Sequence, residues 1–202
     1  MSPIGNSPTQ SDRQIVDAAR TGDERALSEL YLLYFPRVYR YILARTGNQY
    51  DAEDLAEEVF MKVLEAIDRF QWREAPFSAW LFRIAHNAVI SKRRKETSRG
   101  KSIQLTDIYA TDADGPEILV ESRLAVREVM AAAQKLPDAQ RQVIALRFGA
   151  GLTVAETARA MGKGDGNVKV IQHKAIAKLR EMMGQPKRQP AAYARERAGT
   201  GT

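Results

Sequence analysis

Two short predicted helices joined by a glycine-rich turn, between Leu152 and Glu181, constrain the fold of this chain more than any other feature. Thr153 and Glu156 have the spacing of a capping box, which predicts that a helix begins at Val154. Three closely spaced glycines then end that helix. Beyond them, apolar residues recur every three or four positions and predict a second helix. Two such helices around a tight turn are typical of a helix-turn-helix.

The second of these helices, expected from Asn167 to Glu181, leaves one polar and basic face exposed. That face carries Asn167, Lys169, Gln172, His173 and Lys178. Hydrogen-bond donors and cations of this kind suit base edges and phosphates, so the pattern favours DNA binding. The alternative is a plain helical hairpin with a solvated outer face, and this stretch alone leaves both interpretations open.

The composition excludes several classes of function. The chain has 202 residues and no cysteine, which rules out disulfides, thiol catalysis and cysteine-ligated metal sites. Its two histidines, His86 and His173, are far apart, and no nucleophile–base–orienter set is evident. We therefore expect no metal, no cofactor and no enzymatic activity. A formal net charge of +6 leans towards a polyanionic partner.

No apolar run reaches transmembrane length, and the first residues are polar and lack a hydrophobic signal segment. We therefore expect a cytoplasmic protein with no membrane partner.

The periodicity along the chain predicts an all-α fold without β-strands. Two small helical domains are expected, joined by a flexible linker, and the second domain contains the helix-turn-helix. Pro36 is expected to kink or split a long helix that begins at Asp23. The predicted divisions are a disordered N-terminus over 1–11, a first domain over 12–96, a linker over 97–117, a second domain over 118–183 and a disordered basic tail over 184–202.

A predicted helix from Asp51 to Asp68 is strongly acidic in an otherwise basic protein. It carries seven carboxylates and one cation, Lys62. This pattern is compatible with an ordinary solvated face or with a docking surface for a basic partner.

The next predicted helix, from Phe77 to Lys95, ends in four consecutive cations that begin at Lys92. Cations at a helix C-terminus are favourable by ~0.3–1 kcal/mol each, so part of this run has a purely local reason. Four in a row exceed that need and indicate contacts with phosphates.

Four motifs in this order resemble those of the extracytoplasmic-function (ECF) sigma factors, small bacterial proteins with two domains. They are LSELYLLYFPRVYRYILAR (27–45), DAEDLAEEVFMKVLEAIDRF (51–70), PFSAWLFRIAHNAVISKRR (76–94), and LPDAQRQVIALRF followed by LTVAETARAMG and VKVIQHKAIAKLRE. The resemblance implies a non-enzymatic subunit that binds core RNA polymerase, directs it to specific promoters and promotes DNA melting. It also implies nucleoid association in the holoenzyme.

The resemblance also implies roles for individual residues. In the family, the acidic helix docks on the coiled coil of the largest polymerase subunit, and the polymerase flap is a further contact. The matching surface here would be Asp51, Glu53, Asp54, Glu57, Glu58 and Gln71. The third motif acts on the minus-ten promoter element, which implicates Arg83, His86, Asn87, Ser91, Lys92, Arg93 and Arg94. The helix-turn-helix would read the minus-thirty-five element through Thr153, Asn167, Lys169, Val170, Gln172, His173 and Lys174.

The chain departs from the family pattern at two sets of motif residues, and its Gly-rich turn is one of the less regular versions of that turn. Ser91 stands where the family often has Asp, and Val170-Ile171-Gln172 replaces the usual Ser-Arg-Leu. Many family members are held by an anti-sigma protein, which is therefore a candidate partner. Two other interpretations compete with this one. The first is a helix-turn-helix regulator that acts without polymerase, and the second is an adaptor that binds no DNA.

Overall fold

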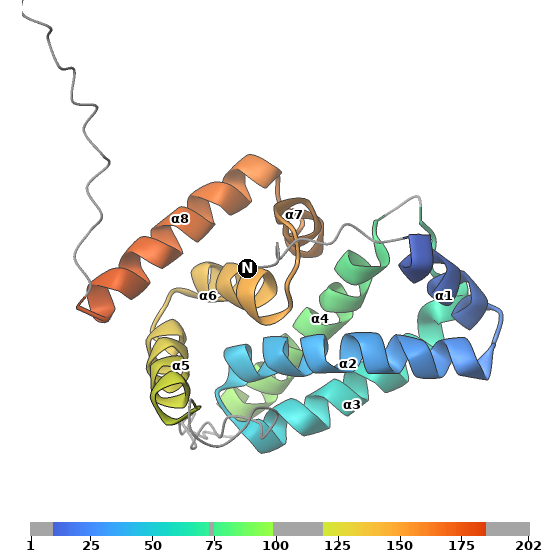
Figure 1. The fold of residues 1–202 in the computed structure, drawn as a ribbon, viewed down its shortest axis with the longest axis horizontal. Coiled ribbons are helices and arrows are strands. Elements are labelled where there is room, and N and C mark those ends of the chain that lie inside the picture. Colours follow the sequence, from blue (N-terminus) through green and yellow to red (C-terminus); the bar gives the residue numbers. More distant parts are fainter. Residues whose placement is uncertain (1–9, 73–74, 99–118, 185–202) are drawn as a thin grey trace, which may run out of the picture.

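The computed structural model describes residues 10–72, 75–98 and 119–184, and within these ranges the chain forms helices and no strand (Figure 1). The all-α prediction is confirmed. In chain order the helices are α1 (Gln10–Arg20), α2 (Glu24–Thr46), α3 (Gln49–Ala66), the 3-10 turn η1 (Ile67–Arg69), α4 (Phe77–Ser98), α5 (Leu119–Gln134), α6 (Asp138–Ile144), the π-helical turn η2 (Ala145–Gly149), α7 (Val154–Met161) and α8 (Asp165–Met182).

Helices α1 to α4 form the first group, in which α2 and α3 lie side by side and α4 packs against both. Local chemistry sets the helix ends. The carboxylate of Asp23 accepts from the backbone N–H of Arg25 at 2.9 Å and begins α2. Gly47, with φ 72°, ends it in the left-handed conformation. Asn48 then caps α3 through the N–H of Asp51 at 3.0 Å, so α3 begins two residues before the predicted start.

Pro36 does not split α2, so the prediction of a kink or a split was wrong as regards the split. The helix runs from Glu24 to Thr46 with the proline inside it. Proline leaves the carbonyl four residues earlier, that of Leu32, without its helical donor. Because Leu32 is 72% exposed, water can reach this part of the helix, and the missing bond costs less than it would in a core.

Helices α6 to α8 with η2 form the predicted helix-turn-helix unit. The capping box at the start of α7 is complete: the backbone N–H of Glu156 donates to Thr153 Oγ1 at 3.2 Å, and that of Thr153 donates to Glu156 Oε2 at 2.8 Å. Gly162, with φ 62°, ends α7. Helix α8 begins at Asp165, so its first turn includes Gly166 and starts two residues before the prediction.

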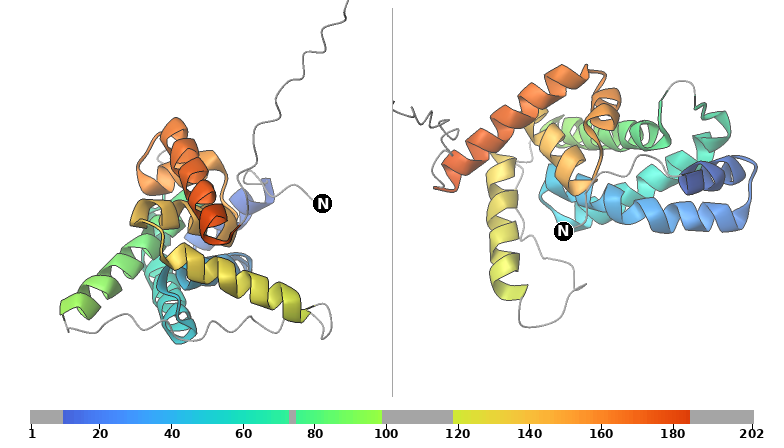
Figure 2. Two further views of the ribbon diagram at one scale, coloured as in Figure 1. Left: turned by 90° about the vertical axis from the view of Figure 1, so that its left-hand side faces the viewer. Right: turned by 45° about the horizontal axis from the view of Figure 1, so that its top comes forward.

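The two groups of helices are packed against each other rather than held apart (Figure 2). Leu146 of η2 and Leu152, just before α7, are fully buried in the same apolar cluster as the core of α1 to α4. Most of the predicted linker lies outside the described residues, as do nearly all of the predicted N-terminal and C-terminal segments.

Candidate polymerase and nucleic-acid interface

The acidic residues of α3 lie on the opposite side of the helix from its buried stripe. Ala52, Leu55, Ala56 and Val59 face the core, while Glu53, Asp54, Glu57 and Glu58 are exposed. Glu58 pairs with Lys62 at 2.5 Å, one turn further along, with both side chains about half exposed. Such a pair is weak, and the face as a whole keeps its negative charge. Gln71, after η1, is also exposed.

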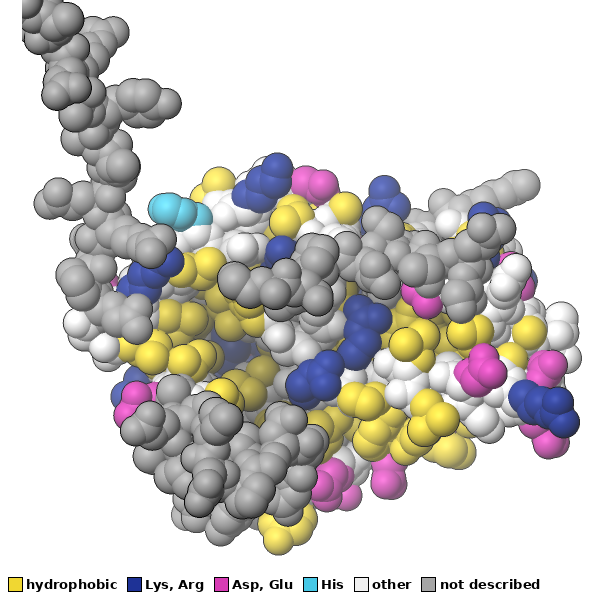
Figure 3. All heavy atoms as spheres, viewed as in Figure 1, with side chains coloured by type: hydrophobic (Ala, Val, Ile, Leu, Met, Phe, Trp, Pro, Cys, Tyr) yellow, Lys and Arg dark blue, Asp and Glu magenta, His cyan; other side chains and the backbone are white. Residues whose placement is uncertain are grey.

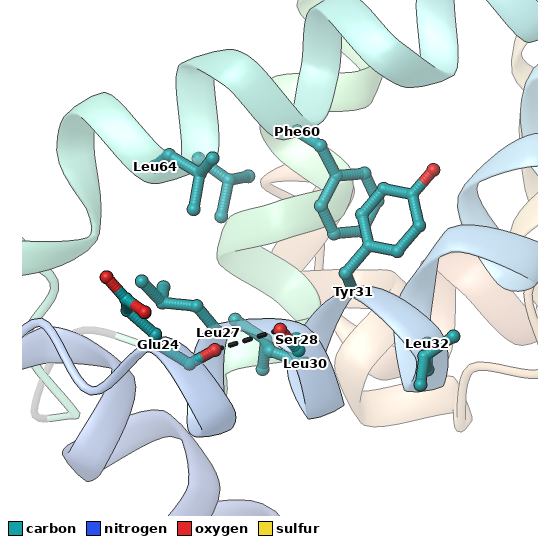
Figure 4. A pocket seen from close by; sticks show the side chains of 9 residues that line it. Glu24, Leu27, Ser28, Leu30, Tyr31, Leu32, Phe60 and Leu64 are labelled. Carbon is teal, nitrogen blue, oxygen red and sulfur yellow. Dashed lines mark hydrogen bonds between the residues drawn. The ribbon is translucent and has the colours of Figure 1, made fainter.

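A shallow apolar pocket of about 480 Å³ lies between α2 and α3. Tyr31 and Phe60 meet edge-to-face at its wall, with ring centroids 5.0 Å apart, and Leu64 closes the opposite side (Figure 4). Leu32 and Leu64 are 72% and 47% exposed, so this surface is open to solvent. An acidic face beside an exposed apolar pocket suits a partner helix that carries both cations and apolar side chains.

Helix α4 presents the predicted minus-ten residues in two environments. Asn87, Ser91 and Arg94 are exposed and carry no hydrogen bond or ion pair from another helix within the described residues. Arg83 is exposed as well, and its Nη2 donates to the backbone carbonyl of Arg159 in α7 at 3.3 Å. The remaining members of the set, His86, Lys92 and Arg93, are partly buried and bonded to other helices.

Lys92 joins the two predicted surfaces of the first group of helices. Its Nζ donates to Asp51 Oδ1 at 2.5 Å and lies 3.6 Å from Glu96. Burial alone would lower the pKa of Lys92, but the bond to Asp51 and the nearby Glu96 outweigh it and raise that pKa. Lys92, a predicted DNA contact, is thus paired with Asp51, a predicted polymerase contact, and each neutralises part of the other's charge.

His86 is packed under the second group of helices. Its Nδ1 lies 3.0 Å from the side-chain amide of Gln142 in α6 and 3.4 Å from the hydroxyl of Tyr41 in α2. Burial, together with the nearby guanidinium of Arg45, lowers the pKa of His86. The neutral ring is therefore favoured here. Burial also raises the pKa of the Tyr41 hydroxyl, to about 12.

An ion cluster that the sequence patterns did not predict centres on Asp138, the first residue of α6. Its Oδ1 accepts from Arg45 Nη2 of α2 at 2.8 Å and from Arg93 Nη1 of α4 at 2.7 Å. Arg141, one turn further along α6, lies 3.4 Å away. The side chain of Arg45 is fully buried, and that of Asp138 is about half exposed. Burial raises the pKa of Asp138, but the two arginines from the first group outweigh it and hold that pKa below its ordinary value.

The exposed face of α8 carries most of the predicted minus-thirty-five residues. Asn167, Lys169, Val170, His173 and Lys174 are exposed, while Val168, Ala175 and Leu179 are buried. A histidine and basic side chains are visible along this helix (Figure 3). Thr153 differs from the others, because its hydroxyl is engaged in the capping box.

Gln172 is partly buried and has a structural partner. Its Oε1 accepts from Arg147 Nε of η2 at 3.0 Å, and another nitrogen of the same guanidinium donates to the carbonyl of Leu152. Arg147 therefore ties α8 to the turn before α7. The sequence patterns did not predict this role of Arg147, because its partner Gln172 lies 25 positions away in another helix.

Comparison with known proteins decides the family. The Sigma-70 region 2 model matches residues 30–99, and the Sigma-70, region 4 model matches residues 132–181. The ECF RNA polymerase sigma factor BldN of Streptomyces coelicolor is 34% identical over 186 residues, which are 90% of this chain and 69% of that protein. The chain belongs to the ECF sigma factor family. This sigma factor is thus a transcription initiation factor, and its partners are RNA polymerase and promoter DNA.

Two solved structures share the fold. CnrH, solved in complex with the cytosolic domain of CnrY, has a TM-score of 0.67 at 23% identity, over 87% of this chain and 98% of that one. The sigma factor RpoE of Bartonella quintana, solved with the anti-sigma factor NepR, has a TM-score of 0.64 at 23% identity, over 78% of this chain and 96% of that one. Family membership favours the sigma interpretation over a polymerase-independent regulator. Among the described helices of this chain, none has an apolar stretch long enough to cross a bilayer.

Proposed function

We propose that the two domains of this sigma factor, residues 12–96 and 118–183, have different binding roles. The first domain binds core polymerase through the acidic face of α3 and opens the minus-ten element with α4. The second reads the minus-thirty-five element with α8. The distribution of charge carries this proposal: α3 exposes a row of carboxylates, whereas α4 and α8 expose cations, and Lys92 pairs with Asp51 where α3 and α4 meet. Surfaces of opposite sign on one small protein suit two partners of opposite charge.

The polymerase contact combines the acidic face with the apolar pocket beside it. Glu53, Asp54, Glu57 and Glu58, with Asp51 and Gln71 at the edges, meet basic residues on the coiled coil of the largest subunit. The exposed Leu32 and Leu64 supply apolar area next to them. Charge complementarity sets orientation and on-rate, while the apolar contact contributes most of the affinity. The second domain meets the flap.

The DNA contacts differ between the two elements. Along α4, the cations Arg83, Lys92, Arg93 and Arg94 hold the backbone of a separated strand, while His86, Asn87 and Ser91 lie close enough along the helix to meet its bases. On α8, Asn167 and Lys169 lie in the first two turns, the part of a recognition helix that enters the major groove. With its carbonyl oxygen held by Arg147, Gln172 has its amide N–H₂ free to donate to a base. The proposed DNA-binding set also includes Val170, His173 and Lys174, which are exposed on α8, and Thr153 at the start of α7.

An anti-sigma protein is the third partner that we propose. A groove of about 390 Å³ lies between α5, η2 and α2, and Val126, Val129 and Phe148 are exposed along it. A groove of this composition fits the apolar face of an amphipathic helix. The sigma factor catalyses no reaction itself, and we place it in the cytoplasm, at the nucleoid when it is part of the holoenzyme.

Run-off transcription tests the proposed function directly. Purified core polymerase is given a fragmented genomic library with and without the protein, and the 5′ ends of the transcripts are sequenced. We expect a small set of start sites that appear only with the protein and that share two upstream elements. Transcripts that are identical with and without the protein would contradict the proposal.

A further inference from the structure

The contact between the two groups of helices covers part of the surface proposed to bind DNA. Arg83 bonds to α7, while His86 and Arg93 bond to α6. Ser78, near the start of α4, donates to Glu156 Oε1 of α7 at 2.5 Å in a buried site. A strand that lay along this side of α4 would have to displace α6 and α7. The arrangement in Figure 1 is therefore closed with respect to the minus-ten element.

Asp138 is the centre of this closed arrangement. Its carboxylate binds Arg93, a proposed phosphate contact, and also Arg45, whose side chain is fully buried. Arg45 Nη1 makes a second bond, to the backbone carbonyl of Asp138, at 3.1 Å. Carboxylate and phosphate oxygens present the same kind of acceptor to a guanidinium, so the two compete for the same donors.

We propose that Asp138 is an intramolecular latch. Its carboxylate stands in for a DNA phosphate on Arg93 and keeps the free protein in a closed state, in which α6 and α7 cover one side of α4. Opening releases Arg45 and Arg93 to the template. This inference rests on the proposed role of α4 in DNA binding. The closed state itself is argued from the bonds of α4 with α6 and α7 and does not depend on that role.

Close backbone packing at Gly149 allows the same contact to be weakened by a substitution that changes no charge. A β-carbon added at Gly149 would lie 3.3 Å from the backbone oxygen of Arg40 and 3.6 Å from the α-carbon of Tyr41. Arg40 Nε also donates to the carbonyl of Gly149 at 3.1 Å. A β-carbon at this position requires η2 and α2 to shift by a few tenths of an ångström, and the longer side chain of leucine needs more room, while the charge of the latch stays the same.

The first test measures opening in the full-length protein. The chain has no cysteine, so Gln14→Cys in α1 and Glu181→Cys in α8, both exposed, provide two dye sites for single-molecule energy transfer. We expect one dominant state in 50 mM KCl. Asp138→Asn and Gly149→Leu should each raise the ratio of open to closed molecules by about fivefold to fiftyfold, since the lost contacts are only partly buried. Asp68→Asn, an exposed carboxylate far from the contact in sequence, is the matched control and should change nothing.

The second test measures DNA binding by the same variants. The probe is a fluorescent 20-nucleotide single-stranded DNA of mixed sequence, because the proposed latch competes with phosphates rather than with particular bases. We expect Asp138→Asn and Gly149→Leu to bind this probe more tightly, by the same factor as their shift in opening. The control Asp68→Asn should match the parent protein in both assays.

The outcomes separate the latch from the proposed function. Opening together with tighter DNA binding in both variants supports the inference. Unchanged energy transfer in both variants overturns the latch and leaves the proposed DNA contacts standing. Opening without any gain in DNA binding overturns the competition at Arg93 and counts against the proposed role of α4. A salt titration of the parent protein needs no substitution, and a rise in the open fraction as KCl increases to 0.5 M would also support the ionic latch, because salt screens its exposed side.

Discussion

Reversing the charge of Glu57 and Glu58 should weaken binding to core polymerase without unfolding the protein. Both side chains are exposed on α3, and neither contributes to the buried stripe. Each substitution by lysine removes an attraction worth ~0.2–1 kcal/mol and replaces it with a repulsion of similar size. The pair should therefore cost about 1–4 kcal/mol, a roughly fivefold to several-hundredfold rise in Kd.

The effect on folding should be much smaller. Glu57 has no ion pair with another described residue, and only the exposed pair of Glu58 with Lys62 is lost, worth ~0.3–0.5 kcal/mol. Circular dichroism melting checks this, and fluorescence anisotropy with labelled sigma factor and purified core enzyme gives Kd.

The matched control for this experiment is Glu65→Lys, on the same helix two turns beyond Glu58. It changes the net charge in the same direction but lies outside the proposed surface. The Kd of this control should stay within about twofold of the parent at 0.15 M salt, where the Debye length is about 8 Å. Equal losses for the double reversal and for the control would refute the reasoning, since they would show that net charge matters and the location on α3 does not.

Three further predictions concern other parts of the molecule. Thr153→Ala removes the side-chain cap of α7 and should lower the free energy of unfolding by ~0.5–2 kcal/mol in a urea titration. Thr153→Ser keeps the hydroxyl and should not lower it, so equal stability of the two variants would contradict the capping role. Lys169→Ala should weaken recognition of the minus-thirty-five element, by ~1–3 kcal/mol if the ammonium group meets a base, and an unchanged promoter preference in run-off assays would show that another face of α8 reads the DNA. The lowered pKa of His86 predicts that its contribution to the closed state is complete above the unfolded pKa of about 6.5 and is lost as the pH falls below that value, because the folded site disfavours the proton. The groups that face the ring are Tyr41 and Arg45 of α2, Arg93 of α4, and Asp138 and Gln142 of α6. Energy transfer between the dyes at pH 7.5 and 5.5 checks the pH effect, which should disappear in His86→Gln.

Local signals in the sequence were enough to predict the helices and one complete motif. The capping box depends on residues three apart, Thr153 and Glu156, so its spacing alone predicts the start of α7. The helix ends at Gly47 and Gly162 are also predictable from local sequence, because glycine readily adopts the left-handed conformation that ends a helix. Periodicity also predicted the buried stripe of α3 and hence the exposed acidic face opposite it.

The contacts between the two groups of helices could not be predicted in this way. Arg45 and Asp138 are 93 positions apart, and nothing in the pattern around either residue indicates its partner. Asp138 also has a local reason to be present, since a carboxylate in the first turn of α6 suits the helix dipole. The favourable interaction with the helix dipole is enough to explain an aspartate at this position, so the sequence gives no sign of its bonds to Arg45 and Arg93. The same holds for Arg147 in the π-helical turn η2 and Gln172 in α8, which bond to each other although they are 25 positions apart.

Co-elution with core RNA polymerase tests the central claim most directly. The purified sigma factor is mixed with core enzyme that lacks an initiation subunit, and the mixture is separated by size-exclusion chromatography at 0.15 M salt. The account predicts that one equivalent of the chain moves to the elution volume of the polymerase and that a smaller fraction of the chain moves when it carries the Glu57 and Glu58 reversals. A chain that elutes alone at every ratio of the two components would contradict the account.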